Sequence, residues 1–396
     1  MIVRKITQAE EARADELFAI AFEQALDRTK TPPQEEPGRA VRWAAFGPDG
    51  QMMSTFCVTG FTVNFDGGAY RMGGIGGVAT LPQYRRQGGI RACFQAALPA
   101  LYQEGFCFSY LYPFSTAYYR KFGYENCVQK WHATRDLGLL RPEETGGSFR
   151  LAESGTPLAE AVRAIDQLWE SRYNMMVRHG GSACDWLAAP DPAASQTFCY
   201  VYFSSAGAPK SYVVFQKQDQ PDGRNLVCRS FRFADREGYM GLMHILKSLS
   251  SDHRLAKFEL PAEPSMQYLA PEWSLGAAQW RIQPAGMVRA VNVEQALRGA
   301  RYIGDGSVTL RILDGIIPEN DRCFSVRFSG GAAEQVEITE APPDAVLDIS
   351  AFSALICGVC DFSGAAAWFN GIQIQNQDAP LDRVFYRKPL MIADYF

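Results

Sequence analysis

Residues 73–94 read GGIGGVATLPQYRRQGGIRACF, and this stretch decides the kind of domain that the first third of the chain forms. The apolar run VATL leads through a short turn at Arg85 and Arg86 into a segment that starts at Gly88 and has apolar residues at helical spacing. A helix N-terminus offers unpaired N–H groups and a partial positive charge, and glycine at 88 and 89 lets an anion approach the backbone. The flanking arginines add charge-assisted hydrogen bonds. The stretch therefore predicts a strand–turn–helix unit suited to a diphosphate group.

Two better-known phosphate motifs do not fit this stretch. No G-K-[ST] closes it, so it is not a Walker A loop. The upstream GGIGG is followed by a strand-like run rather than a helix, unlike a dinucleotide-binding fingerprint. Glycines inside a strand are typical of a bulge or a close backbone approach, and such a strand can separate from its neighbour. We therefore expect free backbone groups that suit an amide-rich ligand such as pantetheine.

Length and composition narrow the class of protein. The chain has 396 residues, which is too long for one core, so two or three domains are expected. A net charge of -4 argues against a nucleic-acid partner. No segment approaches the roughly 20 apolar residues that span a bilayer, and the charged first residues argue against a signal peptide. The expectation is a cytoplasmic protein with no membrane partner.

Cysteine and histidine patterns do not favour a metal or covalent-hydrolase site. Cys357 and Cys360 form a lone C-x-x-C, which is compatible with redox chemistry or half a zinc site, but no second pair has suitable spacing. The buried structural interpretation is favoured. The sequence contains neither H-E-x-x-H nor G-x-S-x-G, so no metal is expected and a serine nucleophile is disfavoured.

The pattern of elements indicates an α/β (α+β) plan with mixed sheets. Residues 10–28 predict a helix, strand-like runs follow at 41–47 and 52–65, and a helix is predicted at 88–104. A middle block from about residue 146 to 285 has a similar order of elements. A last block begins near residue 287.

A second motif makes the comparison with a known family specific. V-A-T-L-P-Q-Y-R-R-Q-G-G resembles the acetyl-CoA signature R/Q-x-x-G-x-G/A of the GNAT superfamily, with Ile90 where many members have Gly or Ala. About thirty residues later, A-Y-Y-R-K-F-G-Y-E spans Ala117 to Glu125. The combination is similar to the Enhanced intracellular survival (Eis) family. That resemblance implies a GNAT domain at 1–140, a degenerate GNAT-like domain at 141–286 and a sterol-carrier-protein-like domain at 287–396.

The resemblance also implies roles for individual residues and an acetyl-CoA cosubstrate. Residues expected to bind it are Val78 and Thr80, through backbone groups on pantetheine, and Arg85, Arg86, Gly88 and Gly89, around the pyrophosphate. Tyr119 matches the family's general acid. The family's general base is the terminal carboxylate, here on Phe396, and the chain ends in an apolar-aromatic DYF.

These roles describe an N-acetyltransferase that acts on a small primary amine without a covalent enzyme intermediate. A carboxylate can accept the amine's proton and a tyrosine hydroxyl can protonate the departing sulfur. The alternative is a non-catalytic acyl-CoA or lipid carrier, since the last domain resembles a lipid-carrier fold. The family resemblance further suggests a homo-oligomer, often a hexamer.

The acceptor amine stays open at this stage. Acidic residues at Asp27, Glu35 and Glu36 could attract a cationic amine or form a solvated surface. Tyr395 stands where family members that acetylate cationic drugs can carry an acid, which argues against an aminoglycoside preference.

Overall fold

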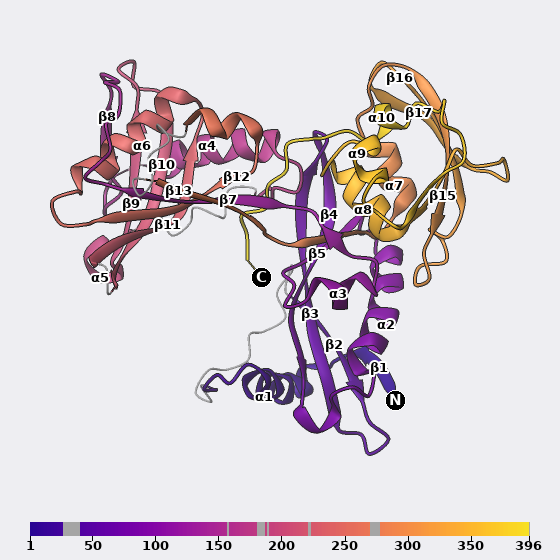
Figure 1. The fold of residues 1–396 in the computed structure, drawn as a ribbon. Coiled ribbons are helices and arrows are strands. Elements are labelled where there is room, and N and C mark those ends of the chain that lie inside the picture. The colour runs from indigo at the N-terminus through magenta and orange to yellow at the C-terminus, as the bar shows by residue number, and fades with distance from the viewer. Residues whose placement is uncertain are drawn as a thin grey trace. The chain divides into compact units, whose positions relative to one another are not determined.

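The protein is described here by a computed structural model that covers residues 1–26, 40–156, 158–179, 187, 190–220, 223–269 and 278–395 (Figure 1). The chain forms two compact units. The first contains Met1–Val128, Ala285–Lys388 and Ile392–Phe396, and the second contains Gln129–Pro284 and Pro389–Met391.

The first unit contains a sheet in the order β1-β2-β3-β4-β5-β14-β6. Its strands are β1 (Ile2–Lys5), β2 (Val41–Phe46), β3 (Met52–Phe65), β4 (Gly68–Thr80), β5 (Phe108–Leu111), β6 (Glu125–Asn126) and β14 (Met287–Ala290). Its helices are α1 (Glu11–Ala21), α2 (Gly89–Gln103) and α3 (Thr116–Arg120). The β2–β3–β4 part is antiparallel, whereas β4 and β5 run parallel. The sheet is therefore mixed, as the sequence predicts.

Helices α1 and α2 cover opposite faces of this sheet. Trp43 and Ala45 belong to the core under α2, while Ala44 and Phe46 belong to the core under α1. This alternation follows from the two-residue period of a strand. Helix α2 buries Phe94 and Leu98 in the larger core. Burying each such side chain stabilises the fold by about 1.5–3 kcal/mol.

The C-terminal part of the first unit forms its own sheet in the order β17-β16-β15-β18-β19. Its strands are β15 (Gly306–Leu313), β16 (Cys323–Ser329), β17 (Ala332–Ile338), β18 (Ala345–Asp348) and β19 (Ile372–Ile374). Its helices are α7 (Val293–Gly299), α8 (Ile349–Cys357), α9 (Phe362–Ala366) and α10 (Leu381–Val384). Cys357 lies buried in α8 and Cys360 is half-buried after it, both as free thiols.

Strand β14 joins this C-terminal part to the first sheet. It pairs antiparallel with both β5 and β6, with Val288 opposite Tyr110 on one side and opposite Glu125 on the other. Arg289 of β14 forms an ion pair with Asp314 at 2.7 Å, and both side chains are 0% exposed. Removing one partner of such a buried pair costs about 3–5 kcal/mol. The C-terminal part is thus anchored to the first sheet by hydrogen bonds and by a buried charge pair.

The second unit contains a sheet in the order β13-β7-β12-β11-β10-β9-β8. Its strands are β7 (Gln129–Asp136), β8 (Ser148–Leu151), β9 (Thr197–Phe203), β10 (Pro209–Gln220), β11 (Gly223–Phe233), β12 (Leu255–Pro261) and β13 (Ala278–Pro284). Its helices are α4 (Ala159–Arg172), α5 (Pro192–Ser195) and α6 (Arg236–Ser248). The predicted domain boundary after residue 140 falls inside this unit, because β7 pairs with β12 and β13.

Local details differ from the sequence expectations at the N-terminus. A strand, β1, precedes the first helix and pairs with β2. The helix predicted at 10–28 ends at Ala21, and Glu23 adopts a left-handed conformation with φ of 54°. Helices cannot continue through that conformation. Within the described ranges, no helix is both long and apolar enough to cross a membrane.

Candidate active site

The parallel strands β4 and β5 separate at their C-terminal ends. They pair from Met72 opposite Phe108 to Ile75 opposite Leu111, where β5 ends. Strand β4 continues to Thr80. Within the described part of the chain, the β5 side of residues 76–80 therefore has no strand partner. Its backbone N–H and C=O groups are available to a ligand.

A bulge helps to form this free edge. The pairing of β3 with β4 shifts register between Thr55 and Cys57, and Gly77 has φ of 60°. Only glycine adopts this conformation readily, so the GGIGG motif supplies the bulge that the sequence predicts. Val78 packs against the core, and the Thr80 hydroxyl lies 2.9 Å from Ser54 Oγ. Both side chains are engaged, which leaves backbone groups for binding.

The turn between β4 and α2 ends in an uncapped helix start. Gly88 occupies the N-cap position with φ of 84°, and no side chain caps the helix there. A Cβ on Gly89 would lie 2.4 Å from Ser54 Oγ, whereas a Cβ on Gly88 would meet no atom within 4 Å. Gly89 is therefore required for packing, and Gly88 for its backbone conformation. The first N–H groups of α2 remain open to an anion.

Arg85 and Arg86 flank this helix start and are exposed. Among the described residues, neither arginine has an ion-pair partner. Arg86 adopts φ of 65°, which is uncommon for a residue with a side chain. The turn thus combines two free guanidinium groups, two glycines and the N-terminus of a 15-residue helix. This arrangement fits a diphosphate group.

Tyr119 lies on the short helix α3 and is 2% exposed. Its ring contacts those of Phe94 and Phe114, with centroids 6.1 and 5.4 Å apart. Burial raises the pKa of Tyr119 well above its usual value, so the hydroxyl stays protonated at neutral pH. Within the described residues its hydroxyl has no hydrogen-bond partner, so it is a free proton donor.

The neighbouring tyrosines are less suited to that role. The hydroxyl of Tyr124 is fully buried and lies 2.6 Å from Ser109 Oγ, so it already has a partner. Tyr118 is half-buried, and its pKa is raised by burial. The structure therefore separates the three tyrosines of this segment by environment, which their spacing alone could not do.

The end of the chain lies against the residue that follows β5. The Tyr112 hydroxyl donates to the carbonyl of Asp394 at 2.5 Å, and the Tyr112 ring stacks on Tyr395 with centroids 4.5 Å apart. Tyr112 was not predicted as a site residue, although its position just after a strand of alternating aromatic residues was a usable signal. Phe396 lies outside the described residues, as do Asp27, Glu35 and Glu36.

Comparisons with protein families assign each of the three regions. Residues 2–127 and residues 175–290 each match a family described as an acetyltransferase (GNAT) domain. Residues 293–392 match a family described as a sterol carrier protein domain. The chain contains two GNAT domains and one sterol carrier protein domain. The predicted fold class is confirmed, and no curated protein sequence matches the chain.

Solved structures share this three-domain fold at low sequence identity. A conserved protein of unknown function from Enterococcus faecalis, described as a probable N-acyltransferase, has a TM-score of 0.83 and 22% identity, covering 100% of this chain and 99% of that one. A GCN5-related N-acetyltransferase from Anabaena variabilis has a TM-score of 0.83 and 18% identity, with 100% of each chain covered. Eis1 from Mycobacterium abscessus has a TM-score of 0.76 and 19% identity, again with 100% of each chain covered. At sequence identities this low, the structural similarity establishes a shared fold alone.

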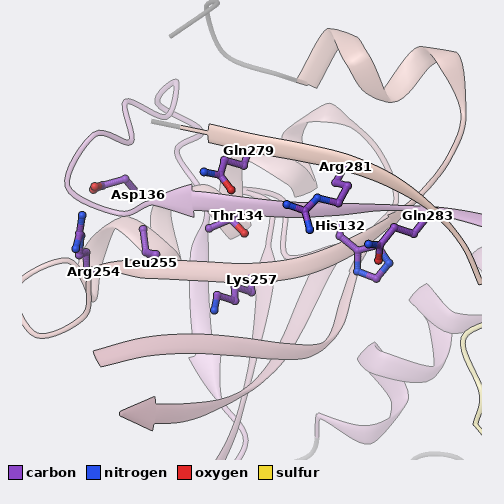
Figure 2. Close-up of a pocket in the computed structure, with 9 residues that line it drawn as sticks. All are labelled: His132, Thr134, Asp136, Arg254, Leu255, Lys257, Gln279, Arg281 and Gln283. Atoms are coloured by element: carbon purple, nitrogen blue, oxygen red, sulfur yellow. The ribbon is translucent and has the colours of Figure 1, made fainter. Parts of the chain in front are cut away.

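The second GNAT domain has a cavity of about 540 Å³ on one face of its sheet (Figure 2). Alternate residues of β7, β12 and β13 line it, among them Thr134, Lys257 and Arg281. His132 in this cavity lies 3.5 Å from Glu259 through Nδ1. Apart from Leu255, the described residues that line it are polar, and none of them is a glycine or a tyrosine. Among the described residues, the free strand edge, the glycine turn with its exposed arginines, and the buried Tyr119 thus lie together in the first GNAT domain.

Proposed function

We propose that the first GNAT domain transfers an acetyl group from acetyl-CoA to a primary amine. The observation that carries this proposal is the uncapped start of α2 at Gly88, which follows directly on the free edge of β4, residues 76–80. One element offers an anion site and the other offers backbone amide groups. CoA presents a diphosphate and a pantetheine with two amides, which need those two kinds of site.

The cofactor half of the site would use six residues of this strand and turn. Arg85 and Arg86 would pair with the pyrophosphate, and the N–H groups beginning at Gly88 and Gly89 would donate to it. The backbones of Val78 and Thr80 would hydrogen-bond to pantetheine. The proposal is supported by the open space at the Gly88 Cα, where a Cβ would meet no atom within 4 Å.

The reaction would proceed by direct attack of the neutral amine on the thioester carbonyl. A carbon–nitrogen bond forms, the carbon–sulfur bond breaks, and the amine loses one proton. The Phe396 carboxylate would accept that proton, and the Tyr119 hydroxyl would give a proton to the departing sulfur. The raised pKa of Tyr119 supports a donor that is neutral before the reaction. The position of Asp394 against Tyr112 supports a terminus close to the end of β5.

Within the GNAT superfamily, we place the chain with the Eis-like acetyltransferases. This finer assignment is supported by the motif Ala117–Glu125, by the order of the three domains, and by the fold shared with Eis1 from Mycobacterium abscessus. The homo-oligomer that this assignment suggests stays a prediction.

A thiol-release assay with acetyl-CoA and a panel of primary amines tests the proposed function. Release of CoA thiol that depends on the amine is expected for at least one acceptor. Tight CoA binding without any thiol release across the panel would favour the carrier alternative.

A C-terminal extension tests the terminal base separately. Fusing a few residues after Phe396 removes the carboxylate from its position, so turnover should fall while CoA affinity is retained. The same residues fused before Met1 provide the control. Full activity of the C-terminal fusion would reject Phe396 as the base.

A further inference from the structure

A cavity of about 300 Å³ lies between the first GNAT domain and the sterol carrier protein domain, inside the first compact unit. One side is formed by Arg91 and Gln95 of α2 and by Arg120 and Lys121 at the end of α3. The other side is formed by the residues after β15 and by the start of α8. Nothing in the roles proposed above uses this cavity.

The wall from the sterol carrier protein domain is held firmly against α3. A Cβ on Gly123 would lie 2.6 Å from Ile349 Cγ2 of α8. The buried Arg289 donates from Nε to the carbonyl of Phe122 at 2.8 Å, and Ser353 Oγ accepts from the Ala290 N–H at 2.8 Å. The two domains therefore present one continuous surface to the cavity.

Among the described residues, two of the arginines around the cavity are paired with carboxylates, and one carboxylate is held by neutral donors. Arg289 pairs with Asp314 beneath it, and Arg120 makes two hydrogen bonds to Glu125, each of 2.7 Å. The carboxylate of Asp348 accepts from the Ala351 N–H and from the Ser350 hydroxyl, each at 2.7 Å, at the start of α8.

Arg91 and Lys121 are the exceptions. Within the described chain, neither has an ion-pair or hydrogen-bond partner for its charged group. One comes from α2 and the other from the chain after α3, and both line the same cavity. The cavity therefore carries two unpaired positive charges against the one negative charge of Asp348, and this net positive charge suits an anion.

Arg91 connects this cavity to the proposed pyrophosphate turn. It is the third residue of α2, two positions after Gly89, so it lies about 3 Å further along the helix axis. It lines one cavity together with Arg120 and Lys121, so its side chain lies on the α3 side of the helix. An anion attached a few bonds from a diphosphate at Gly88 would reach this cavity.

We propose that Arg91 and Lys121 bind the 3′-phosphate of CoA in this cavity, and that the start of α8 in the sterol carrier protein domain forms its far wall. The inference rests on the proposed function, because it assumes that the diphosphate occupies the Arg85–Gly89 turn. CoA carries this second phosphate on its ribose, a few bonds from the diphosphate, and a phosphate monoester has a charge of about −1.5 to −2 at neutral pH. The sterol carrier protein domain then takes part in recognising the cofactor.

Binding of CoA and of 3′-dephospho-CoA to the full chain, measured by calorimetry, tests the inference. The unchanged protein should bind CoA at least about tenfold more tightly, as expected for charge-assisted bonds to a phosphate. In the double variant Arg91→Ala, Lys121→Ala, the ratio of the affinity for CoA to the affinity for 3′-dephospho-CoA should fall towards one. The affinity for 3′-dephospho-CoA itself should stay the same. The double variant Lys257→Ala, Arg281→Ala in the second GNAT domain is the matched control and should keep the full ratio.

Ser350→Glu tests the contribution of the sterol carrier protein domain. Ser350 lies in the first turn of α8, where a carboxylate favours the helix, so the fold should tolerate it. The added charge should weaken CoA binding and leave 3′-dephospho-CoA binding unchanged, whereas Ser350→Gln should change neither. An unchanged ratio in Ser350→Glu would show that α8 is not part of the site.

The remaining outcomes separate the two proposals. Equal affinity of the unchanged protein for the two nucleotides would overturn the 3′-phosphate site and leave the proposed function standing. A lack of binding to either nucleotide would overturn the proposed function as well. Single variants Arg91→Gln and Lys121→Gln, each with an intermediate ratio expected, cover the case in which the double alanine variant does not fold.

Discussion

The two GNAT domains use the same order of elements around their central strands, but in the described residues the point where the parallel strands separate is open in the first domain and packed in the second. In the first domain β4 pairs in parallel with β5 and is followed by α2, and in the second β11 pairs in parallel with β12 and is followed by α6. Each pair of strands is paired over only a few residues. The difference lies in the side chains that occupy the point of separation.

Glycines line that point in the first domain, and aromatic rings fill it in the second. The later half of β4 contains Gly76 and Gly77, with the bulge that frees its edge. The later half of β11 contains Phe231, which stacks on Phe258 of β12 with ring centroids 4.1 Å apart. Both phenylalanines are buried. In the second domain the two strands are thus joined by packed side chains where a ligand would otherwise enter.

The N-termini of the two helices also differ, with an open start in α2 and a capped start in α6. Helix α2 begins at Gly88 without a side-chain cap, whereas α6 begins at Asp235, whose carboxylate accepts from the Gly238 N–H at 3.0 Å. Lys210 pairs with that carboxylate at 2.6 Å. The N-terminus of α6 already holds an anion supplied by the chain itself. Two GNAT domains can therefore share a topology while one has an open helix start and the other a helix start capped by its own side chain.

The largest effect is expected from Tyr119→Phe, which removes the proposed proton donor and keeps the ring. Turnover should fall about 10²- to 10⁴-fold, the range for loss of general acid catalysis, with little change in acetyl-CoA affinity. Because the pKa of Tyr119 is raised, the unchanged enzyme should show no loss of activity from ionisation of this group up to pH 9. Steady-state kinetics across pH measure both, with Tyr118→Phe as the control. Comparable losses in the two variants would contradict the distinction between the tyrosines.

Arg85→Ala with Arg86→Ala should weaken acetyl-CoA binding by about 10- to 100-fold, as expected for loss of charge-assisted hydrogen bonds to a diphosphate. Arg236→Ala is the control, because it removes an arginine from the exposed start of α6, the corresponding turn of the second domain. This variant should keep the full affinity for acetyl-CoA. Calorimetry with CoA measures the affinities. Unchanged affinity in the double variant would remove the basis for the pyrophosphate site.

Gly88→Asp gives α2 the kind of start that α6 has. Asn and Asp tolerate the left-handed conformation similarly, so Gly88→Asn serves as the matched control for backbone strain. The aspartate variant should bind CoA about tenfold more weakly than the asparagine variant, because one added carboxylate faces the diphosphate. Equal affinities would show that the helix start does not contact the diphosphate.

The smallest expected effect is a change in the stability of the second domain when Asp235 is replaced. Burial works against its charge, but the Lys210 ammonium and the Gly238 N–H outweigh burial and lower the pKa of Asp235. A lowered pKa in the folded state stabilises the fold above the usual carboxyl pKa of 3.8, and this stabilisation is lost as the pH falls below it.

Asp235→Ala should therefore destabilise the second domain by about 1 kcal/mol at pH 7, the usual cost of losing an N-cap, and by less at low pH. Urea unfolding at pH 7 and at pH 3 measures the difference, and Asp235→Asn should retain most of the stability because asparagine also caps helices. Acetyl-CoA binding should stay unchanged. A pH-independent loss in Asp235→Ala would show that the charge of Asp235 is not involved.

The sequence by itself determined the elements that depend on interactions between residues close together in the chain. Helix 88–104 was predicted within one residue at each end of α2, because Gly88 favours the left-handed cap and the apolar residues follow a helical period. The bulge in GGIGG was likewise readable, since only glycine adopts φ of 60° readily. The turn from Arg85 to Gly89 and its fitness for a diphosphate needed no knowledge of distant residues.

The tertiary structure alone decided which strands became neighbours and which polar groups became free. The sequence indicates a strand at Met287–Ala290, but its place between β5 and β6 depends on pairing with residues far away in the chain. A period of two residues determines which side chains share a face, and it leaves the identity of the neighbouring strand open. The same holds for the start of α8, which lines the cavity beside Arg91 and Lys121. Helix α8 is held there by long-range contacts with β14, among them the hydrogen bond from the Ala290 N–H to Ser353 Oγ. Local chemistry determined the arginine- and glycine-rich turn, and long-range packing decided what surrounds it.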